Sequence, residues 1–372
     1  MSRSDLACMG MDLDQPGGRV TATTPHRARR RGVLRRHKVL VGMTVLLALI
    51  VAMGAAAVWY VNDTLGSIDR FESTVKPEQR AERPTAGPAA EALNILLLGT
   101  DKGHNEQTIK AELADGEWTR GAFRSDTIMI LHIPKDRSTA YLVSIPRDSY
   151  VDIPGNGRQK VNAAFSFGGP DLALRTIEDL TGVYIDHTAM VDWDGFKDLT
   201  TAIGGVEVEI PESFTSEGRT WTAGTERLEG KRALDYVRTR YGLPNGDFDR
   251  IKRQQNFLRA TMEKAASQGT LTNPVKLKNL LGTIADNTTV DSGFSTGTMR
   301  DLATDLRPIR GDDFVYLTAP FGGYDDVPGV GSVVLLDGPE SKALWKALRD
   351  DDMARYLEAY QGDRLGSPAS VR

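Results

Sequence analysis

The feature that most constrains this chain is a run of 23 residues without a charged side chain, from Val39 to Val61. A helix of that length, at roughly 1.5 Å per residue, spans the roughly 30 Å hydrocarbon layer of a membrane. A cleaved signal peptide is the alternative, because Ala55–Ala57 resembles a peptidase site. The run is long for a signal peptide and follows an unusually long leader, which favours a retained transmembrane helix over 39–61.

The charges on either side of this run predict its orientation. Residues 1–61 carry nine Lys and Arg against three Asp, a net charge of +6, whereas the whole chain has a formal net charge of −4. Because positive flanks stay in the cytoplasm, we expect a disordered cytoplasmic tail over 1–38 and the body outside the cell membrane. The body is therefore acidic, which argues against a nucleic-acid partner. The single cysteine, Cys8, lies in the tail, so the external part has no disulfide.

Composition divides the rest of the chain. The segment 62–91 is polar and rich in Pro and Ala, which is typical of a stalk and linker. We expect an extracellular folded domain over 92–350 and a C-terminal tail over 351–372. Within the domain, strand-like apolar runs alternate with helical patterns, which predicts an α/β fold with a central mixed β-sheet flanked by helices.

Three strands organise the predicted domain. Ala92–Gly99 is a continuous apolar run, typical of a strand buried on both faces. It brings Asp101 to its carboxyl end, where open α/β sheets usually place ligands. Thr127–Ile133 and Thr139–Ile145 are rich in β-branched and aliphatic residues and are expected to pair as a hairpin.

Charged residues bracket that hairpin. Arg124 and Asp126 precede its first strand, Arg147 follows its second, and Lys160 lies beyond a Pro-Gly turn. Pairing of the strands brings Arg124 and Arg147 to the same end of the sheet. Guanidinium and carboxylate groups together suit an anionic ligand that carries a divalent metal. A surface salt-bridge cluster is the alternative for the charges alone.

A second polar group surrounds a predicted loop between two helices. Its members are Arg238, Arg240, Arg250, Arg253 and Gln254. Arg250 and Gln254, four residues apart, share one helix face. Arginines that complement a helix dipole explain one member but not the whole group. With Asp101 and Asp126 as candidate Mg²⁺ ligands, the residues suit a pyrophosphate. Zinc spacing and nucleotide-binding or hydrolase motifs are absent from the sequence.

Eight motifs in unbroken order resemble the LytR-CpsA-Psr family. They are NILLLGTD (94–101), RSDTIMILHI (124–133), SIPRDSYVDIPG (144–155), KVNAAFSFGG (160–169), IDHTAMVDWDGF (185–196), AIGGVEVEIP (202–211), LEGKRALDYVRTR (228–240) and DFDRIKRQQNFL (247–258). The resemblance implies an α/β domain that transfers a glycopolymer from a polyprenyl-pyrophosphate carrier to peptidoglycan, using Mg²⁺. A lipid pyrophosphate phosphatase and a non-catalytic envelope regulator are the alternatives.

The resemblance also implies roles for individual residues. Asp101 and Asp126 are expected to hold the metal. The pyrophosphate is expected to contact Arg124, Arg147, Lys160, Arg238, Arg240, Arg250 and Gln254. The residues expected to take part in catalysis are Asp101, Arg124, Asp126, Arg147 and Arg238. A slot for the polyprenyl chain is expected from Ile128, Ile130, Leu142 and Val143 together with a helix over Asp171–Leu180. Asp101 and Asp249 are the candidate general bases.

Overall fold

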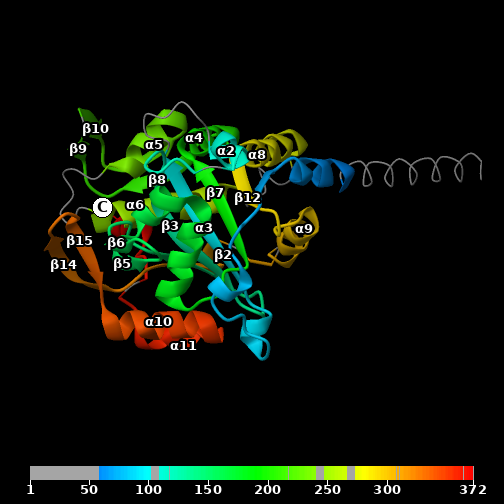
Figure 1. The fold of residues 1–372 in the computed structure, drawn as a ribbon. Coiled ribbons are helices and arrows are strands. Elements are labelled where there is room, and N and C mark those ends of the chain that lie inside the picture. The colour runs from blue at the N-terminus through cyan, green and yellow to red at the C-terminus, as the bar shows by residue number, and fades with distance from the viewer. Residues whose placement is uncertain are drawn as a thin grey trace, which may run out of the picture. The chain divides into compact units, whose positions relative to one another are not determined.

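The structure is a computed structural model that describes residues 58–371 apart from 102–108, 117, 217, 240–246, 266–272, 307, 310 and 363. These residues form a mixed α/β fold with a central mixed sheet flanked by helices, as predicted (Figure 1). Among the described helices, none is both long and apolar enough to cross a bilayer. Residues 39–57, most of the predicted transmembrane run, lie outside the described part.

Seven of the described strands make up the central sheet. In order across it they are β1 (Asp69–Phe71), β12 (Thr288–Asp291), β7 (His187–Asp192), β2 (Leu93–Asp101), β3 (Arg124–Ile133), β4 (Ala140–Ser144) and β13 (Phe314–Thr318). Strand β2 runs antiparallel to β3 and parallel to β7. Strands β3 and β4 form the predicted hairpin, with Ile130 opposite Val143.

Alternate side chains of the central strands face two different helical layers. Leu96 and Ile130, both 0% exposed, pack in a core cluster with α3 (Asn162–Thr181) and α10 (Gly338–Asp350). Leu97 and Met129 face the opposite way, towards α4 (Trp193–Ala202), α5 (Gly230–Arg238) and α6 (Asp247–Ala265). The period of two along each strand thus gives the sheet two apolar faces, as expected for a sheet covered on both sides.

Smaller elements complete the described fold. The paired strands outside the central sheet are β5 (Tyr150–Ile153) with β6 (Gly157–Lys160), β8 (Val206–Ile210) with β11 (Gly224–Leu228), β9 (Phe214–Ser216) with β10 (Arg219–Trp221), and β14 (Phe321–Val327) with β15 (Gly331–Leu336). The remaining α-helices are α2 (Ile109–Asp115), α8 (Pro274–Asn287), α9 (Thr296–Asp305) and α11 (Met353–Ala359). Short 3₁₀ turns cover Pro77–Gln79, Pro88–Ala90, Gly311–Asp313 and Pro368–Ser370.

Helix α3 is longer than predicted and is kinked. The backbone leaves helical geometry at Gly168 and Gly169, immediately before Pro170. Gly169 has a φ of 65°, and a Cβ there would lie 2.9 Å from the ring of Trp118, so only glycine fits. Pro170 has no backbone N–H to continue the helical hydrogen bonds across the kink. The short segment before the kink carries the residues that α3 contributes to the site.

Two segments that the sequence predicts to be a linker and a tail differ in the structure. In 62–91, β1 adds an edge strand to the sheet, and Arg80 forms an ion pair of 2.8 Å with Glu178, whose side chain is 0% exposed. In 351–372, helix α11 is followed by the buried Val371. In 62–91 the composition indicates neither the strand nor the ion pair, because a three-residue strand and a single buried ion pair leave no periodic pattern in the sequence.

Candidate active site

The site begins where the central strands end. Asp101, the last residue of β2, lies opposite Arg124, the first residue of β3. The pairing shifts register between Gly99 and Thr100. A Cβ on Gly99 would lie 2.8 Å from the Cβ of Thr127, so glycine allows the two strands to approach closely at this point. The carboxyl end of β2 and the start of β3 therefore place a carboxylate beside a guanidinium, as the sequence predicts.

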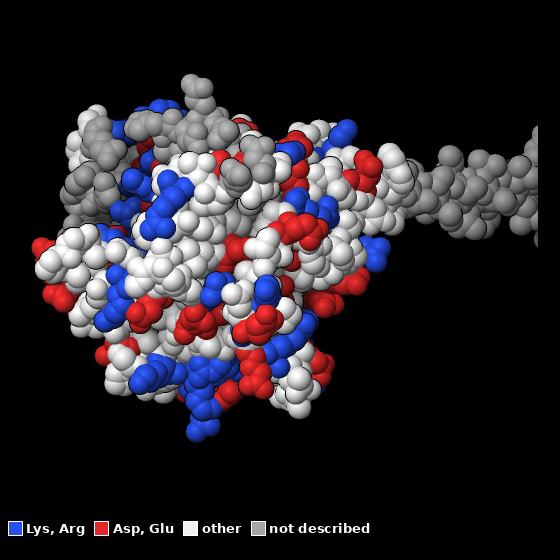
Figure 2. Space-filling view, viewed as in Figure 1, with Lys and Arg blue, Asp and Glu red and all other residues white. Residues whose placement is uncertain are grey.

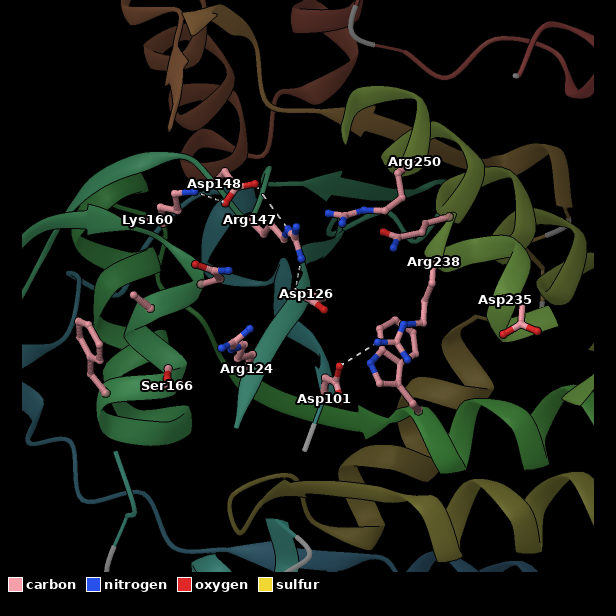
Figure 3. Close-up of a pocket in the computed structure, with 15 residues that line it drawn as sticks. Asp101, Arg124, Asp126, Arg147, Asp148, Lys160, Ser166, Asp235, Arg238 and Arg250 are labelled. Carbon is pink, nitrogen blue, oxygen red and sulfur yellow. Dashed lines mark hydrogen bonds and ion pairs between the residues drawn. The ribbon is translucent and has the colours of Figure 1, made fainter. Parts of the chain in front are cut away.

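A cavity of about 670 Å³ opens at this end of the sheet (Figure 3). Five cationic and four acidic side chains line it: Arg124, Arg147, Lys160, Arg238 and Arg250, with Asp101, Asp126, Asp148 and Asp235. Over the face drawn in Figure 2, Lys and Arg are interspersed with Asp and Glu and form no continuous basic surface. The cationic groups that can bind one anion together are the five that line the cavity. We call this cavity the polar pocket.

Arg147 connects two of the carboxylates in the polar pocket. Its Nη1 donates to Oδ1 of Asp126 at 2.6 Å, and its Nε lies 3.5 Å from Oδ2 of Asp148. Lys160 Nζ lies 3.1 Å from the other oxygen of Asp148. The side chains of Arg147 and Asp126 are each 16% exposed, so water screens their attraction only in part.

Arg238 makes the corresponding contact on the other side of the polar pocket. It lies at the last position of α5, and its Nη2 donates to Oδ2 of Asp101 at 3.1 Å. Its guanidinium also lies 5.4 Å from the centre of the Trp193 ring, within the range of a cation–π contact. Trp193 is placed by the start of α4, where the Asp192 side chain accepts a hydrogen bond from the Gly195 N–H at 2.7 Å and caps the helix.

The remaining cations reach the pocket from β3 and α6. Arg124 is exposed and has no ion-pair partner within the described part of the chain. Arg250 is 4% exposed, so an anion that it meets in the pocket is little screened by water. Gln254, one turn further along α6, donates to the carbonyl of Val237 at 3.3 Å and accepts from Thr127 Oγ1 at 3.4 Å. These contacts fix the side of α6 that faces the sheet.

The structure brings together eight of the nine residues that are predicted to bind the metal or the pyrophosphate. They are Asp101, Arg124, Asp126, Arg147, Lys160, Arg238, Arg250 and Gln254. Arg240 lies outside the described residues. Asp249, predicted as a candidate base, is 3% exposed and does not line the pocket, because the residue before Arg250 on a helix points to a different side.

Some residues that line the pocket were not predicted. Trp193, Asn162 and Ser166 lie in motifs that carry the family resemblance, but their side chains have no charge. Asn162 and Ser166 are four residues apart on the first segment of α3, a spacing that places both on one face. That spacing is the only signal in the sequence that points to them.

The acidic residues fit a metal that arrives with its substrate. Within the described residues, no three Asp, Glu, His or Cys side chains are grouped to hold a metal ion. Asp101 and Asp126, from adjacent strands, are two carboxylates that face one cavity (Figure 3). Mg²⁺ characteristically takes one or two carboxylates and completes its shell with water and substrate phosphates. This donor set therefore fits Mg²⁺ bound together with a pyrophosphate.

A second, apolar cavity of about 220 Å³ adjoins the polar pocket. It lies between the sheet and helices α4, α5 and α6, and its lining includes Leu97, Met129, Ala189, Phe196, Leu199 and Phe257. Trp193 and Gln254 line both cavities. A ligand with an anionic head and an apolar tail can therefore occupy the polar pocket and the apolar cavity at once.

The four strand residues predicted to form a lipid slot do not line the apolar cavity, and three of them lie on the other face of the sheet. Ile128, Ile130 and Val143 belong to the core cluster packed against α3, and Leu142 packs with Tyr316 in another cluster. None of the four lines the apolar cavity. Because β3 and β4 are apolar on both faces, the sequence does not distinguish the face filled by α3 from the face that leaves a cavity.

Comparison with known proteins gives consistent results. The model of the LytR_cpsA_psr family matches residues 61–350. A probable cell wall biosynthesis protein, LcpB of Corynebacterium glutamicum, is 35% identical over 294 residues, covering 77% of this chain and 69% of that protein. A polyisoprenyl-teichoic acid–peptidoglycan teichoic acid transferase, TagU of Enterococcus faecalis, is 35% identical over 269 residues, covering 72% of this chain and 81% of that protein.

Solved structures share the fold. The structure of B. subtilis TagV has a TM-score of 0.57 at 24% identity and covers 70% of this chain and 98% of its own. A structure of TagT bound to LIIa-WTA has a TM-score of 0.56 at 24% identity and covers 75% of this chain and 98% of its own. At these identities the likeness supports the arrangement of the sheet and its helices.

Proposed function

The chain belongs to the LytR-CpsA-Psr family, and on that premise we propose that it transfers a glycopolymer from a polyprenyl-pyrophosphate carrier to peptidoglycan. The name of the relative TagU describes a transfer of this kind from a polyisoprenyl carrier to peptidoglycan. One observation carries the proposal for this chain: the polar pocket and the apolar cavity meet at Trp193 and Gln254. A polyprenyl pyrophosphate likewise has an anionic head, which suits the polar pocket, joined to a long apolar chain, which suits the apolar cavity.

The cations of the polar pocket suit the head of such a carrier. Arginine can bind phosphate oxygens through two parallel N–H groups, and Arg147 and Arg238 each donate a terminal N–H to a carboxylate of the pocket in this structure. We infer that the pyrophosphate takes the place of these carboxylates as the partner of both guanidiniums. The released Asp101 and Asp126 then face the substrate.

The reaction requires mainly position and charge neutralisation. The acceptor hydroxyl oxygen forms a bond to the phosphorus that carries the glycopolymer, and the bond from that phosphorus to the lipid phosphate breaks. The hydroxyl proton passes to Asp101, the candidate base that lines the polar pocket. Arg124, Arg147 and Arg238 offset the charge that moves to the departing lipid phosphate. Asp101 and Asp126 would hold Mg²⁺, which when bound supplies further neutralisation of the pyrophosphate. The apolar cavity binds the prenyl chain next to the head group and so positions the pyrophosphate against the three arginines.

A transfer assay tests the proposal. Purified full-length protein in detergent is incubated with a donor labelled in its glycan, with and without peptidoglycan fragments. We expect label to appear in peptidoglycan and lipid phosphate to be released only when the acceptor is present. Release of lipid phosphate without acceptor at an equal rate indicates a phosphatase instead. No release under either condition refutes both activities.

The location of the activity is part of the proposal. We propose a single-pass membrane protein, with residues 1–38 in the cytoplasm and the catalytic domain outside, supported by the basic tail before the uncharged run. Protease added to intact cells should digest the domain and spare an N-terminal tag. A domain that survives external protease would reverse the orientation.

A further inference from the structure

Two exposed aromatic side chains lie together on hairpin β14–β15. Phe321 is 45% exposed and Tyr324 is 57% exposed, and their ring centres are 4.9 Å apart. Phe248, near the start of α6, completes the group at 4.6 Å from Phe321 and 6.1 Å from Tyr324. Contiguous exposed aromatic surface on a soluble domain characteristically marks a binding site. We call these three residues the aromatic triad.

The triad is not explained by packing or by the membrane. The other large apolar side chains that the structure describes as exposed are Val58, Trp59 and Val275. The first two lie in or beside the predicted transmembrane run, and Val275 stands alone on α8. A single exposed apolar residue is ordinary, whereas two exposed rings in contact with a third are not.

The backbone of β14 places the two rings on one face. In a regular strand, residues three apart point to opposite faces. Between Phe321 and Gly323 the pairing with β15 shifts by one residue, so Gly322 is the extra residue of a β-bulge. A Cβ on Gly322 would lie 2.9 Å from backbone atoms of Leu336 and Asp337, and Gly323 has a φ of +141°. The bulge therefore requires glycine at both positions, and it is the bulge that brings Phe321 and Tyr324 to the same face.

The triad is connected to two residues of the polar pocket. Phe248 precedes Arg250 by two positions on α6. On the other side, the N–H of Val334 in β15 donates to the carbonyl of Asp148 at 2.9 Å. Figure 1 shows β14 and β15 beside β5 and β6, the hairpin that follows Asp148. The elements that carry the triad therefore adjoin Asp148 and carry Arg250, two residues of the polar pocket.

The chemistry of this surface suits an uncharged sugar chain. Flat aromatic rings have a negative face, which attracts the C–H groups on the face of a pyranose ring. Asp326 is exposed and lies two residues after Tyr324, on the same face of β14, where its carboxylate can accept hydrogen bonds from sugar hydroxyls. Its negative charge and that of the neighbouring Asp325 repel a phosphate-rich polymer, so the surface discriminates against an anionic glycopolymer.

We propose that the aromatic triad binds the glycan strand of peptidoglycan and directs the acceptor hydroxyl towards the polar pocket. The inference rests on the proposed transfer function, because it assigns the acceptor of that reaction. The donor lipid occupies the apolar cavity beside Trp193, and the triad provides a separate surface for the second substrate. Phe248, Phe321 and Tyr324 are binding residues in this account and do not touch the pyrophosphate.

The test compares the double variant Phe321→Ala/Tyr324→Ala with wild type and with Val275→Ala, an exposed apolar residue away from the triad. The probe is an uncharged hexamer of N-acetylglucosamine, titrated against the full-length protein in detergent. We expect its Kd, and the KM for peptidoglycan fragments, to rise roughly tenfold or more in the double variant. The Kd for a short-chain polyprenyl pyrophosphate, kcat at saturating acceptor and the melting temperature should stay within twofold or a few degrees of wild type.

A second variant separates ring stacking from apolar area. Tyr324→Leu keeps an apolar side chain but has no flat ring, so it should weaken hexamer binding while Tyr324→Phe restores it. Unchanged hexamer binding and acceptor KM in the double variant would overturn the inference. So would weaker binding of the donor glycopolymer with unchanged acceptor KM. If wild type binds the hexamer but transfers nothing, the proposed function fails and the hexamer titration still decides the role of the triad.

Discussion

Replacing Arg147 by lysine is the substitution that best separates a phosphate-binding arginine from a structural one. In the structure Arg147 reaches Asp126 at 2.6 Å through Nη1 and Asp148 at 3.5 Å through Nε. A lysine keeps the positive charge, but its single ammonium lacks the planar fork that holds two phosphate oxygens at once. We therefore expect Arg147→Lys to resemble Arg147→Ala in turnover.

The size of the loss follows from the contacts. A hydrogen bond to a charged group contributes roughly 1.5–3 kcal/mol, and about 1.4 kcal/mol corresponds to a tenfold change in rate. Loss of one such contact to the transition state should lower kcat/KM by roughly tenfold to a hundredfold. The side chains of Arg147 and Asp126 are 16% exposed, so their ion pair also contributes to stability. A loss of about 1 kcal/mol lowers the melting temperature by only about 2–4 °C in a domain of this size class.

The assay measures kcat/KM at 25 °C and the melting temperature for both variants. Arg158→Lys is the matched control, because Arg158 lies on the neighbouring β6, is 53% exposed and contacts only residues outside the polar pocket among those described: the Tyr150 carbonyl at 3.2 Å, the Tyr150 ring and Asp152 at 4.0 Å. That control should keep wild-type turnover. If Arg147→Lys retains turnover within about threefold of wild type, which is under 1 kcal/mol of barrier, the bidentate role is refuted.

Three further substitutions test other parts of the account. Asp126→Asn should abolish transfer and the response to added Mg²⁺ while the melt changes by a few degrees; transfer that still rises with Mg²⁺ would rule Asp126 out as a ligand. Ala189→Phe should fill part of the apolar cavity and raise KM roughly tenfold for a polyprenyl donor, while inhibition by inorganic pyrophosphate, which has no prenyl chain, stays unchanged; equal weakening of both would contradict a lipid site there. Arg80→Ala should destabilise the domain by roughly 3 kcal/mol, because Glu178 is left buried without its cation, with turnover of the folded protein unchanged; an unchanged melt would mean that 62–91 adds no stability.

The central strands and the charged residues at their ends were predictable because they leave clear local patterns. The apolar run that ends at Asp101 indicates a buried strand, and the charges before and after the hairpin mark where its strands begin and end. Pairing of β3 with β4 then fixes that Arg124 and Arg147 lie at the same end of the sheet. Strand pairing therefore brings charged residues that are more than twenty positions apart in the sequence into one site.

The continuous apolar runs that make the central strands easy to predict also conceal the position of the apolar cavity. A strand buried on both faces has no polar side to reveal its orientation, so Met129 and Ile130 look equivalent in the sequence. Only the packing of α3 on one face and of α4 to α6 on the other distinguishes them. Trp193 was missed because its role depends on where the N-cap of α4 places the first turn of that helix.

The edge features depend on contacts that are distant in the sequence. Strand β1 has three residues and pairs with β12, more than two hundred positions away. The aromatic triad joins α6 to β14, and it forms only because a bulge at Gly322 turns Phe321 towards the side of Tyr324. Neither feature has a period or a propensity that a local reading of the chain would detect.

A crystal structure of the protein with a short-chain polyprenyl pyrophosphate and Mg²⁺ would locate the phosphates, the metal and the prenyl chain in one experiment. We expect phosphate oxygens in contact with Arg124, Arg147 and Arg238, and the metal beside Asp101 and Asp126. We expect the prenyl carbons in the apolar cavity against Phe196 and Phe257. A pyrophosphate bound away from these arginines, or a prenyl chain on the face of the sheet covered by α3, would contradict the proposed binding of the donor.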